Sequence, residues 1–240
     1  MLILASNSPR RKQLLSLGGW IINVVAPQVN EKVRPGERPE EYVKRVAKQK
    51  AFATFTSLPN TAPQADPFED TFIIAADTSV IDPGGIDSSA AILGKPADAI
   101  EAEEILRRLR GRIHQVYSGV TVLRASDGAQ LDEVVISDVR MRSYSDDEIK
   151  EYIATGNPFD KAGAYAIQHP TFRPVQNLQG CYANVMGLPV CQAALMLTEI
   201  GCPPVSNVAL ECQQSLIYPC KIYRQVLLGD ISKRNELHWI

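Results

Sequence analysis

The apolar residues of the N-terminal segment occur in two short runs with a polar stretch between them. Residues 2–6, LILAS, and residues 22–26, INVVA, have the length of buried strands. Between these runs, Pro9 follows serine and asparagine residues that can cap a helix, and the pair Gly18-Gly19 ends the helical pattern. The pattern therefore predicts a strand, a helix and a second strand.

A longer helix is predicted for residues 39–56. Its acidic residues come first and its lysines later, which is the order that the helix dipole favours. Val43 and Val46 belong to its apolar stripe, and Lys50 lies on the same stripe. The ammonium group of Lys50 must therefore extend to solvent or into a polar pocket.

The next apolar run, residues 72–81, predicts a strand whose end becomes polar at Asp77 and Thr78. The Pro-, Thr- and Asp-rich residues 57–70 before it predict a loop. Residues 83–90, PGGIDSSA, predict the tip of a hairpin after it.

Helix and strand patterns continue to alternate downstream. Residues 97–110 have helical spacing, and residues 114–125 and 134–144 alternate as paired strands joined through the turn signal Asp127-Gly128.

The last predicted elements begin with a capping box, Ser145 to Glu148, which opens a helix. We expect residues 163–168 and 181–188 to be extended and residues 188–201 to form a final amphipathic helix, after which the periodicity is weak. Helices interleaved with hairpins predict an α/β fold with a mixed β-sheet and flanking helices.

The composition is that of an ordinary globular protein. Of the 240 residues 45% are hydrophobic, and 25 basic residues face 27 acidic ones, for a net charge of −2. This balance excludes a disordered chain and argues against non-specific binding to nucleic acid or anionic membranes. No apolar stretch approaches the roughly 18–20 residues that span a bilayer, and the N-terminal run is too short for a signal peptide. We expect a cytoplasmic protein with neither a nucleic-acid nor a membrane partner.

The cysteines are five in number, occur only in the last quarter of the chain and never have CxxC spacing: Cys181, Cys191, Cys202, Cys212 and Cys220. This pattern favours free or buried thiols in a reducing compartment over a C-terminal metal or redox cluster.

Polar residues gather at the start of the first predicted helix. A helix N-terminus suits an anion, yet Arg10, Arg11 and Lys12 place cations there, against the helix dipole. An anionic ligand would remove this conflict, so the segment is a candidate phosphate site. The alternative is an ordinary capped helix with solvated arginines.

Further polar residues stand where a fold does not require them: Asp77 ends an apolar strand, Lys95 lies between glycine and proline, and Asp160-Lys161 precede small residues and the amide of Gln168. Each also has a purely structural explanation, such as a turn cap or a surface ion pair. Together they indicate a polyphosphate ester with a recognised head group, whose chemistry needs a divalent cation, further positive charge and a base.

The familiar signatures of phosphate, zinc and serine chemistry are absent. The sequence contains no GxxxxGK[ST], GxGxxG, HExxH or GxSxG motif, and its three histidines are scattered. A Ser/His/Asp triad assembled by the fold stays open at this point.

Seven motifs follow one another along residues 2–201: SNSPRRK from Ser6, KA from Lys50, AADT from Ala75, GKP from Gly94, HQVYSGV from His114, DKAGAYAIQ from Asp160 and NVMGLP from Asn184. In this order they resemble the Maf family of nucleoside triphosphate pyrophosphatases. The resemblance implies cleavage between the α- and β-phosphates, to a monophosphate and diphosphate, with Mg²⁺ or Mn²⁺. It also implies two lobes around a deep cleft, and a homodimer.

The resemblance assigns the acid–base and metal roles to two carboxylates. Asp77 matches the residue regarded as the proton acceptor that activates water, and nearby cations would keep it ionised. Glu31 matches a position at which we expect a metal ligand, together with Asp77. Asn30 precedes it where the family often has aspartate, so one carboxylate is missing.

Three positions imply the substrate. Arg10, Thr78 and Gln168 match the combination of the branch that acts on dTTP and UTP, whereas a 7-methyl-GTP branch carries Trp, Gln and Glu. A neutral glutamine can pair with the imide edge of a pyrimidine.

The remaining matched residues carry binding roles. Phosphate contacts are implied for Ser8, Arg11, Lys50 and Lys95, with supporting roles for Asp160 and Lys161.

The chain departs from the family pattern in two places. After Gln168 it has HPTFRPVQNLQGCY where relatives often carry a glycine-rich stretch. Residues 1–201 form the predicted catalytic domain, and residues 202–240 are an extension that docks on it, mediates oligomerisation or hangs loose. Leu237 and Trp239 favour docking of its end.

The main hypothesis is thus a pyrophosphatase that removes pyrimidine triphosphates, including modified ones, from the nucleotide pool. A nucleotide-binding regulator of cell division with little turnover is the alternative, disfavoured by the retained Asp77 and Lys95. A DNA-binding module is disfavoured by the near-neutral charge.

Overall fold

The computed structural model describes residues 1–58, 71–82, 84 and 91–228. Most of the predicted loop 57–70 and of the predicted hairpin tip 83–90 lies outside the described residues. The same holds for Leu237 and Trp239 at the end of the extension.

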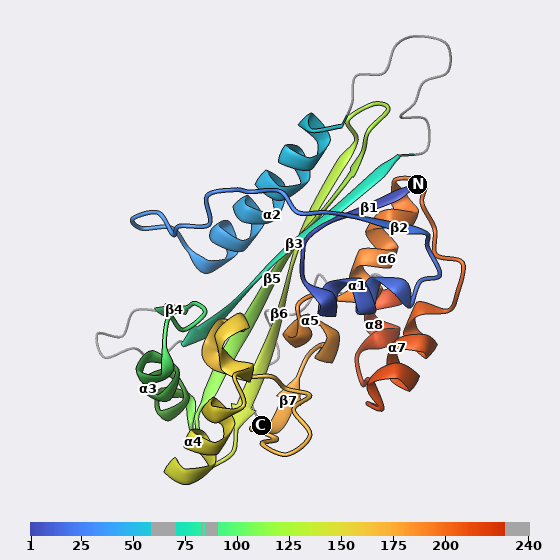
Figure 1. Cartoon of the computed structure of the whole chain (residues 1–240). Coiled ribbons are helices and arrows are strands. Elements are labelled where there is room, and N and C mark those ends of the chain that lie inside the picture. The colour runs from blue at the N-terminus through green and yellow to red at the C-terminus, as the bar shows by residue number, and fades with distance from the viewer. Residues whose placement is uncertain (59–70, 83, 85–90, 229–240) are drawn as a thin grey trace.

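The described residues fold around one mixed sheet with strand order β2-β1-β3-β5-β6-β7, and β4 pairs with part of β3 (Figure 1). The pairs β1/β2 and β1/β3 are parallel and the others are antiparallel. This arrangement confirms the predicted α/β fold. The strands are β1 (Leu2–Ala5), β2 (Ile22–Val25), β3 (Phe72–Asp82), β4 (Ala91–Leu93), β5 (Ile113–Arg124), β6 (Gln130–Met141) and β7 (Val175–Gln179).

Helices α1 and α2 connect the parallel strands, as parallel pairing requires. The described residues contain no helix that is both long and apolar enough to cross a membrane. The helices are α1 (Pro9–Ser16), α2 (Pro39–Thr56), α3 (Ala99–Leu109), α4 (Asp146–Ala154), α5 (Tyr182–Met186), α6 (Val190–Glu199), α7 (Val208–Leu216) and α8 (Tyr223–Leu227), with 3₁₀ turns η1 (Asn157–Asp160) and η2 (Ala162–Ala164).

The two faces of the sheet bury different helices because strand side chains alternate. Along β3, Ile73 and Ala75 pack beneath α2. Ile74 and Ala76 face the opposite side, in a core with α1, α5, α6, α7 and α8. Val80, further along that second face, packs with α3 and α4. One strand therefore presents successive residues to two separate cores.

Two expectations for the C-terminal half are wrong. Residues 163–168 are not a strand: Gly163 and Ala164 have positive φ values of 69° and 58°, inside the turn η2. Residues 181–188 contain helix α5, which Cys181 caps and Gly187 ends with a φ of 117°. Both segments are too short for apolar periodicity to distinguish helix from strand. Their conformation depends instead on residues such as Gly163 and Gly187, which have positive φ values.

The described part of the C-terminal extension docks on the core. Val208, Ala209 and Val226 are buried among core residues, against α6. The backbone N–H of Val205 donates to the carbonyl of Gly18 at 2.8 Å, just beyond the end of α1. Of the three expectations for the extension, docking therefore holds for residues 202–228.

The five cysteines are free thiols that are buried or partly buried. Burial raises the pKa of Cys212 to about 11, and it raises that of Cys191 further. In the described ranges, no group of three or more His, Cys, Asp or Glu residues could hold a metal ion.

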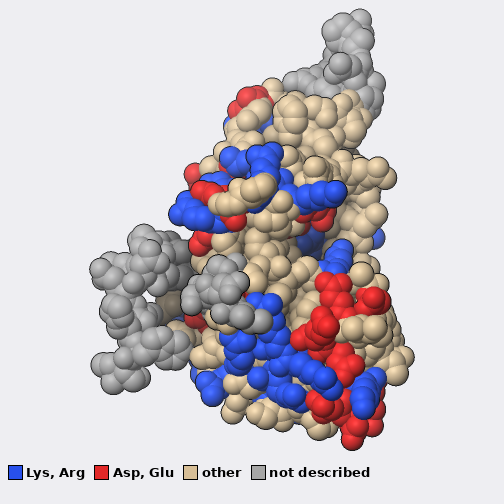
Figure 2. Space-filling view, turned by 90° about the vertical axis from the view of Figure 1, so that its left-hand side faces the viewer, with Lys and Arg blue, Asp and Glu red and all other residues tan. Residues whose placement is uncertain are grey.

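Arginines gather with acidic residues where α3 and α4 face the viewer, in the lower part of Figure 2. Arg107 and Arg110 pair with Asp146, at 2.9 and 2.7 Å. Arg108 and Arg112 pair with the buried Asp82, at 2.6 and 3.1 Å. Each of these four arginines thus already has a carboxylate partner within the fold.

Helix α2 lies very close to the sheet at Gly119 of β5. A Cβ added there would lie 2.4 Å from the carbonyl oxygen of Val43 on α2. Gly119 is also the cross-strand partner of Asp77. The missing side chain therefore lets α2 settle beside Asp77.

We expect Gly119→Ala to push α2 away from the sheet and to lower the free energy of unfolding by about 1–3 kcal/mol. Gly94→Ala is the control, because an added Cβ there meets nothing within 4 Å. Urea unfolding of the two variants measures the difference. Equal stabilities would contradict the close approach.

His114 is a fully buried histidine on β5, with Nε2 2.8 Å from the hydroxyl of Tyr165. Its Nδ1 has no hydrogen-bond partner in the described part of the chain. Burial lowers the pKa of His114 to about 4. In the unfolded chain His114 therefore binds a proton below about pH 6.5, whereas in the folded protein it stays neutral until about pH 4. Lowering the pH through this range therefore lowers the free energy of unfolding.

From this histidine we expect the unfolding free energy to fall by up to about 2 kcal/mol between pH 7 and pH 5. His114→Gln should remove that part of the slope, because glutamine does not titrate. Urea unfolding at several pH values in this window tests it, because most carboxylate titration occurs below pH 5. A variant with the wild-type slope would show that another group is responsible.

Candidate active site

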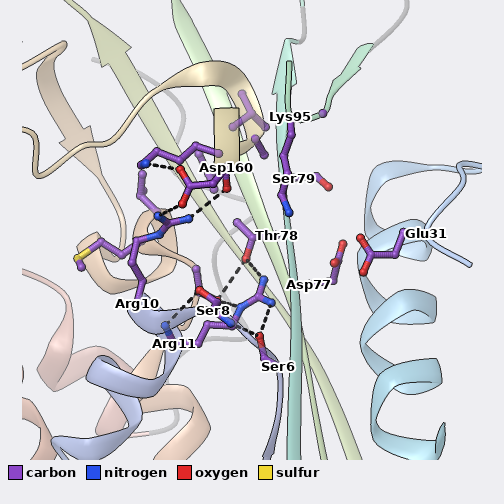
Figure 3. A pocket seen from close by; sticks show the side chains of 18 of the residues that line it. Ser6, Ser8, Arg10, Arg11, Glu31, Asp77, Thr78, Ser79, Lys95 and Asp160 are labelled. Carbon is purple, nitrogen blue, oxygen red and sulfur yellow. Dashed lines mark hydrogen bonds and ion pairs between the residues drawn. The ribbon is translucent and has the colours of Figure 1, made fainter. Parts of the chain in front are cut away.

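The site lies at a gap in one edge of β3. Strand β1 is paired with β3 as far as Ile74, and β4 pairs with it from Val80 onward. Among the described residues, β3 positions 75–79 therefore have a strand only on the β5 side. A cavity of about 680 Å³ opens beside this gap (Figure 3). The chain leaving β1 lines it, so it lies at the carboxyl end of that strand, a usual place for ligands in α/β sheets.

Every residue to which the sequence assigned a role in the site lines this one cavity. They come from six separate stretches of chain, and in sequence order they are Ser8, Arg10, Arg11, Glu31, Lys50, Asp77, Thr78, Lys95, Asp160, Lys161 and Gln168. The roles themselves stay predictions, but the convergence makes one combined site geometrically available.

One end of the cavity is formed by the start of α1. The Ser8 hydroxyl caps the helix by accepting from the backbone N–H of Arg11, and Pro9 occupies the first turn. The Ser6 hydroxyl accepts from the backbone N–H of Ser8 at 3.2 Å. These hydroxyls and the helix N-terminus form a polar surface suited to an anion.

Arg11 is held rigidly but without a counterion. Its guanidinium donates to the carbonyl of Gly187 at 2.9 Å, to the Ser6 hydroxyl at 3.2 Å and to the Thr78 hydroxyl at 3.3 Å. No carboxylate of the described residues forms an ion pair with it. Burial lowers the pKa of Arg11, although the charges of Asp77 and Glu31 oppose this. A partly buried guanidinium bonded only to neutral groups favours an anionic ligand.

Arg10, the neighbouring cation, is held differently. Its guanidinium pairs with Asp160 at 2.9 Å, and Asp160 also accepts from Lys161. Lys161 is buried and donates to the carbonyl of Asn157 at 2.6 Å. The carboxylate thus joins α1 to the η1 turn across one wall of the cavity, as Figure 3 shows.

Lys95 enters from the segment after β4. The backbone N–H of Gly163 donates to the carbonyl of Gly94 at 3.0 Å, which fixes this segment beside η2. Lys95 itself is exposed and forms no ion pair with any described residue. Its ammonium group is therefore available to a ligand in the cavity.

The opposite wall carries two carboxylates that share one ammonium group. Lys50 on α2 lies 2.7 Å from Glu31 and 2.8 Å from Asp77. Partial burial acts to raise the pKa of Glu31, but the hydrogen bond and charge of Lys50, with Lys95 and Arg11, hold it below its usual value. Glu31 is thus ionised at neutral pH. In Figure 3, Asp77 points toward Glu31 while Thr78 points toward Arg11, as their alternation along β3 requires.

Thr78 and Gln168 differ in the hydrogen bonds that they form with other described residues. The Thr78 hydroxyl lies 2.7 Å from the Ser118 hydroxyl and 3.3 Å from the carbonyl of Gly187, besides accepting from Arg11. Gln168 is exposed and its amide makes no hydrogen bond to another described residue. The amide can therefore contact a ligand at the rim.

The loop that carries Glu31 is fastened to α2. Arg45 donates to the carbonyls of Asn30 and Lys32, at 3.3 and 3.0 Å, and the Tyr42 hydroxyl donates to the carbonyl of Glu31 at 2.9 Å. Two bonds from Arg45, at 2.5 and 2.8 Å, lower the pKa of Glu37 to about 2. Three consecutive carbonyls around Glu31 are thus held by two α2 side chains.

Sequence reasoning missed several residues that organise the cavity. Gly187 belongs to the recognised NVMGLP motif, but its carbonyl, which accepts from both Arg11 and Thr78, leaves no local signal. Tyr42 and Arg45 resemble ordinary helix residues in the sequence. Ser6 lay inside the quoted motif without a role of its own, although its hydroxyl joins Ser8 to Arg11.

The donor set fits a divalent cation that shares its coordination with a ligand. Glu31 and Asp77 both direct an oxygen to the same point, since Lys50 contacts both. Oxygen ligands suit Mg²⁺, which is often held by one or two carboxylates together with substrate phosphates. Within the described ranges no third acidic, histidine or cysteine residue completes a cluster.

The fold and the cavity define a class: an α/β protein that binds a polyanion between helix-borne cations and paired carboxylates. The chain belongs to the Maf family, whose sequence model, described as "Maf-like protein", matches residues 1–200. The family resemblance of the sequence is thereby confirmed.

Curated bacterial relatives match over the same region. The chain is 40% identical over 200 residues to a protein of Geobacter sp. (strain M21), covering 83% of this chain and 95% of the relative. It is 42% identical over 201 residues to one of Dictyoglomus thermophilum, covering 83% and 96%. A protein of Anaeromyxobacter dehalogenans (strain 2CP-C) is 42% identical over 204 residues, covering 84% and 95%. All three are named "dTTP/UTP pyrophosphatase".

We expect Arg45→Ala to release the Glu31 loop and to lower the free energy of unfolding by about 1–3 kcal/mol, because Glu37 loses its partner. Hydrogen exchange of the amides in residues 30–37 should accelerate, while exchange in β5 should not. Arg38→Ala is the matched control, since its pair with Glu41 has side chains 73% and 51% exposed. Equal exchange of this loop in the two variants would contradict the role of Arg45.

Proposed function

We propose that the protein hydrolyses nucleoside triphosphates, with dTTP and UTP as main substrates, to the monophosphate and diphosphate. The observation that carries the proposal is the joining of two features in one cavity. Arg11 offers an unpaired positive charge at a helix N-terminus, and Glu31 and Asp77 offer paired carboxylates across from it. The names of the curated relatives support the choice of reaction.

The cationic residues bind the triphosphate in this proposal. Arg11 and the N-terminus of α1, capped by Ser8, contact one phosphate group, and Lys95 contacts another. Asp160 and Lys161 support them by fixing Arg10 against the η1 turn. A rigidly held cation such as Arg11 favours the transition state because it needs no reorganisation as charge develops.

Asp77 acts as the base. Its Oδ1 accepts from Lys50, and no described residue donates to Oδ2. Oδ2 can therefore accept a proton from water while the water oxygen forms a bond to phosphorus. The α–β anhydride bond breaks, and its electron pair leaves with the diphosphate. One water is consumed, and the monophosphate and diphosphate are released.

Glu31 and Asp77 would hold the divalent metal, Mg²⁺ or Mn²⁺. Such an ion supplies charge neutralisation to the phosphate oxygens. Glu31 is positioned for this by the contacts of Tyr42 and Arg45 with its loop. Asn30 cannot add a carboxylate, and its side-chain oxygen instead accepts from the backbone N–H of Lys32.

Pyrimidine selection is assigned to Arg10, Thr78 and Gln168. The amide of Gln168 can both donate to and accept from an imide edge. Thr78, engaged with Arg11 and Ser118, would act by setting the position of the phosphate site relative to the base.

We also propose that residues 1–201 form the catalytic unit and that residues 202–240 are an extension. The docking of α7 and α8 supports a stabilising role for its described part. A homodimer and a cytoplasmic location stay predictions from the sequence. Light scattering coupled to size-exclusion chromatography tests the dimer.

Product analysis by ion-exchange chromatography tests the reaction. The protein is incubated with dTTP, UTP, CTP, dATP, GTP and 7-methyl-GTP, with Mg²⁺ or Mn²⁺. We expect monophosphate and diphosphate from dTTP and UTP. Orthophosphate as the first product would refute the cleavage site, and preference for purines would refute the specificity. Tight dTTP binding without cleavage would favour a nucleotide-binding regulator.

We expect Asp77→Asn to lower kcat about 100- to 10,000-fold, because the amide cannot accept the proton. Nucleotide binding, measured by calorimetry in the absence of metal, should change little. Asp138→Asn is the matched control: Asp138 accepts from Gln115 on the sheet and does not line the cavity. Near-normal turnover by Asp77→Asn would show that another group is the base.

A further inference from the structure

Lys50 occupies an unusual position for a residue expected to bind phosphate. Its ammonium group contacts Glu31 and Asp77, at 2.7 and 2.8 Å, and the residue is 8% exposed. Its ammonium group is instead paired with the two carboxylates expected to hold the metal. Lys50 therefore supplies the positive charge beside these two carboxylates.

The position of Lys50 is fixed by the fold. The residue lies on the apolar stripe of α2, next to the buried Ala51 and between the buried Ala47 and Thr54. The close contact of α2 at Gly119 brings its ammonium to Asp77 on the neighbouring strand. The lysine is thus a permanent feature of this wall, with its carbon chain packed and its charge directed into the cavity.

The two carboxylates would repel each other without a cation between them, because both direct an oxygen to one point. A divalent ion that both of them coordinate needs that same point. The ammonium group and the metal therefore compete for one position, and they cannot both occupy it at full contact.

We propose that Lys50 is a built-in competitor for the metal, which holds the carboxylates in the free protein and moves to a phosphate oxygen when metal and nucleotide bind. The proposal rests on the proposed function, in which Glu31 and Asp77 hold the metal and a triphosphate fills the cavity. It reconciles the phosphate contact implied for Lys50 with the contacts that it makes here.

Coupling between the two ligands follows from this exchange. Metal alone binds weakly, because it must displace an ammonium group that then has no other anion among the described residues. A bound triphosphate offers that anion, so nucleotide and metal strengthen each other's binding by the same factor. The carboxylates thus remain paired with Lys50 until a complete substrate complex forms.

Mn²⁺ binding without nucleotide tests the competition, by electron paramagnetic resonance of free Mn²⁺ and by calorimetry. We expect Lys50→Met to bind Mn²⁺ about tenfold or more tightly than wild type, because a unit charge next to the site is removed. Lys50→Arg keeps the charge and should not show this gain. Lys48→Met is the control on the same helix, since Lys48 pairs with Asp132 at 2.9 Å and does not line the cavity.

The same titrations with a non-hydrolysable α,β-methylene analogue of dTTP test the coupling. The analogue should tighten Mn²⁺ binding in wild type by a larger factor than in Lys50→Met. Melting curves verify that each variant is folded. Unchanged Mn²⁺ affinity in folded Lys50→Met, or equal coupling in both proteins, overturns the proposal.

These measurements need no turnover, so they are separate from the test of the proposed function. A protein that fails to cleave any nucleotide while Lys50→Met binds Mn²⁺ more tightly would lose the proposed reaction and keep the competition. A protein that cleaves dTTP while Lys50→Met binds Mn²⁺ as wild type does would keep the reaction and lose the competition.

Discussion

The contact between Lys50 and Asp77 joins helix α2 to strand β3 at the cavity. It requires α2 to lie close to the sheet, which the missing side chain of Gly119 permits. It also requires β3 to present Asp77 toward α2 and Thr78 toward α1. One strand, through simple alternation, therefore separates the carboxylate wall of the cavity from the anion-binding wall while keeping their residues adjacent in sequence.

The cavity contains cations that have no carboxylate partner among the described residues. Arg11 is bonded to a carbonyl and two hydroxyls, and Lys95 has no ion-pair partner among the described residues. Elsewhere in the fold, arginines such as Arg108 and Arg112 are matched by the buried Asp82. Arg11 and Lys95 therefore leave positive charge available inside a cavity that a polyanion fits, and such a local site is compatible with a net charge near zero for the whole chain.

Local patterns predicted the first helices, the main strands and the position of Lys50, because apolar periodicity and capping residues act over a few positions. They did not predict α5 or the turn η2, whose few residues take their conformation from Gly187 and Gly163 in the folded chain. In the site, the charged side chains could be identified from the sequence as candidate functional residues. The carbonyl of Gly187 and the grip of Arg45 on the Glu31 loop could not, because these contacts join distant parts of the chain.

The C-terminal extension is attached to the end of α1, the helix that carries arginines of the cavity. Helix α1 has 8 residues, a length that is marginal alone in water. Gly18, just after it, accepts from Val205, and the Ser206 hydroxyl donates to the carbonyl of Leu17. The helix that presents Arg10 and Arg11 is therefore fastened at its C-terminal end by a segment beyond the family match. Changes in that segment can alter the rigidity of the anion site without touching any residue that lines it.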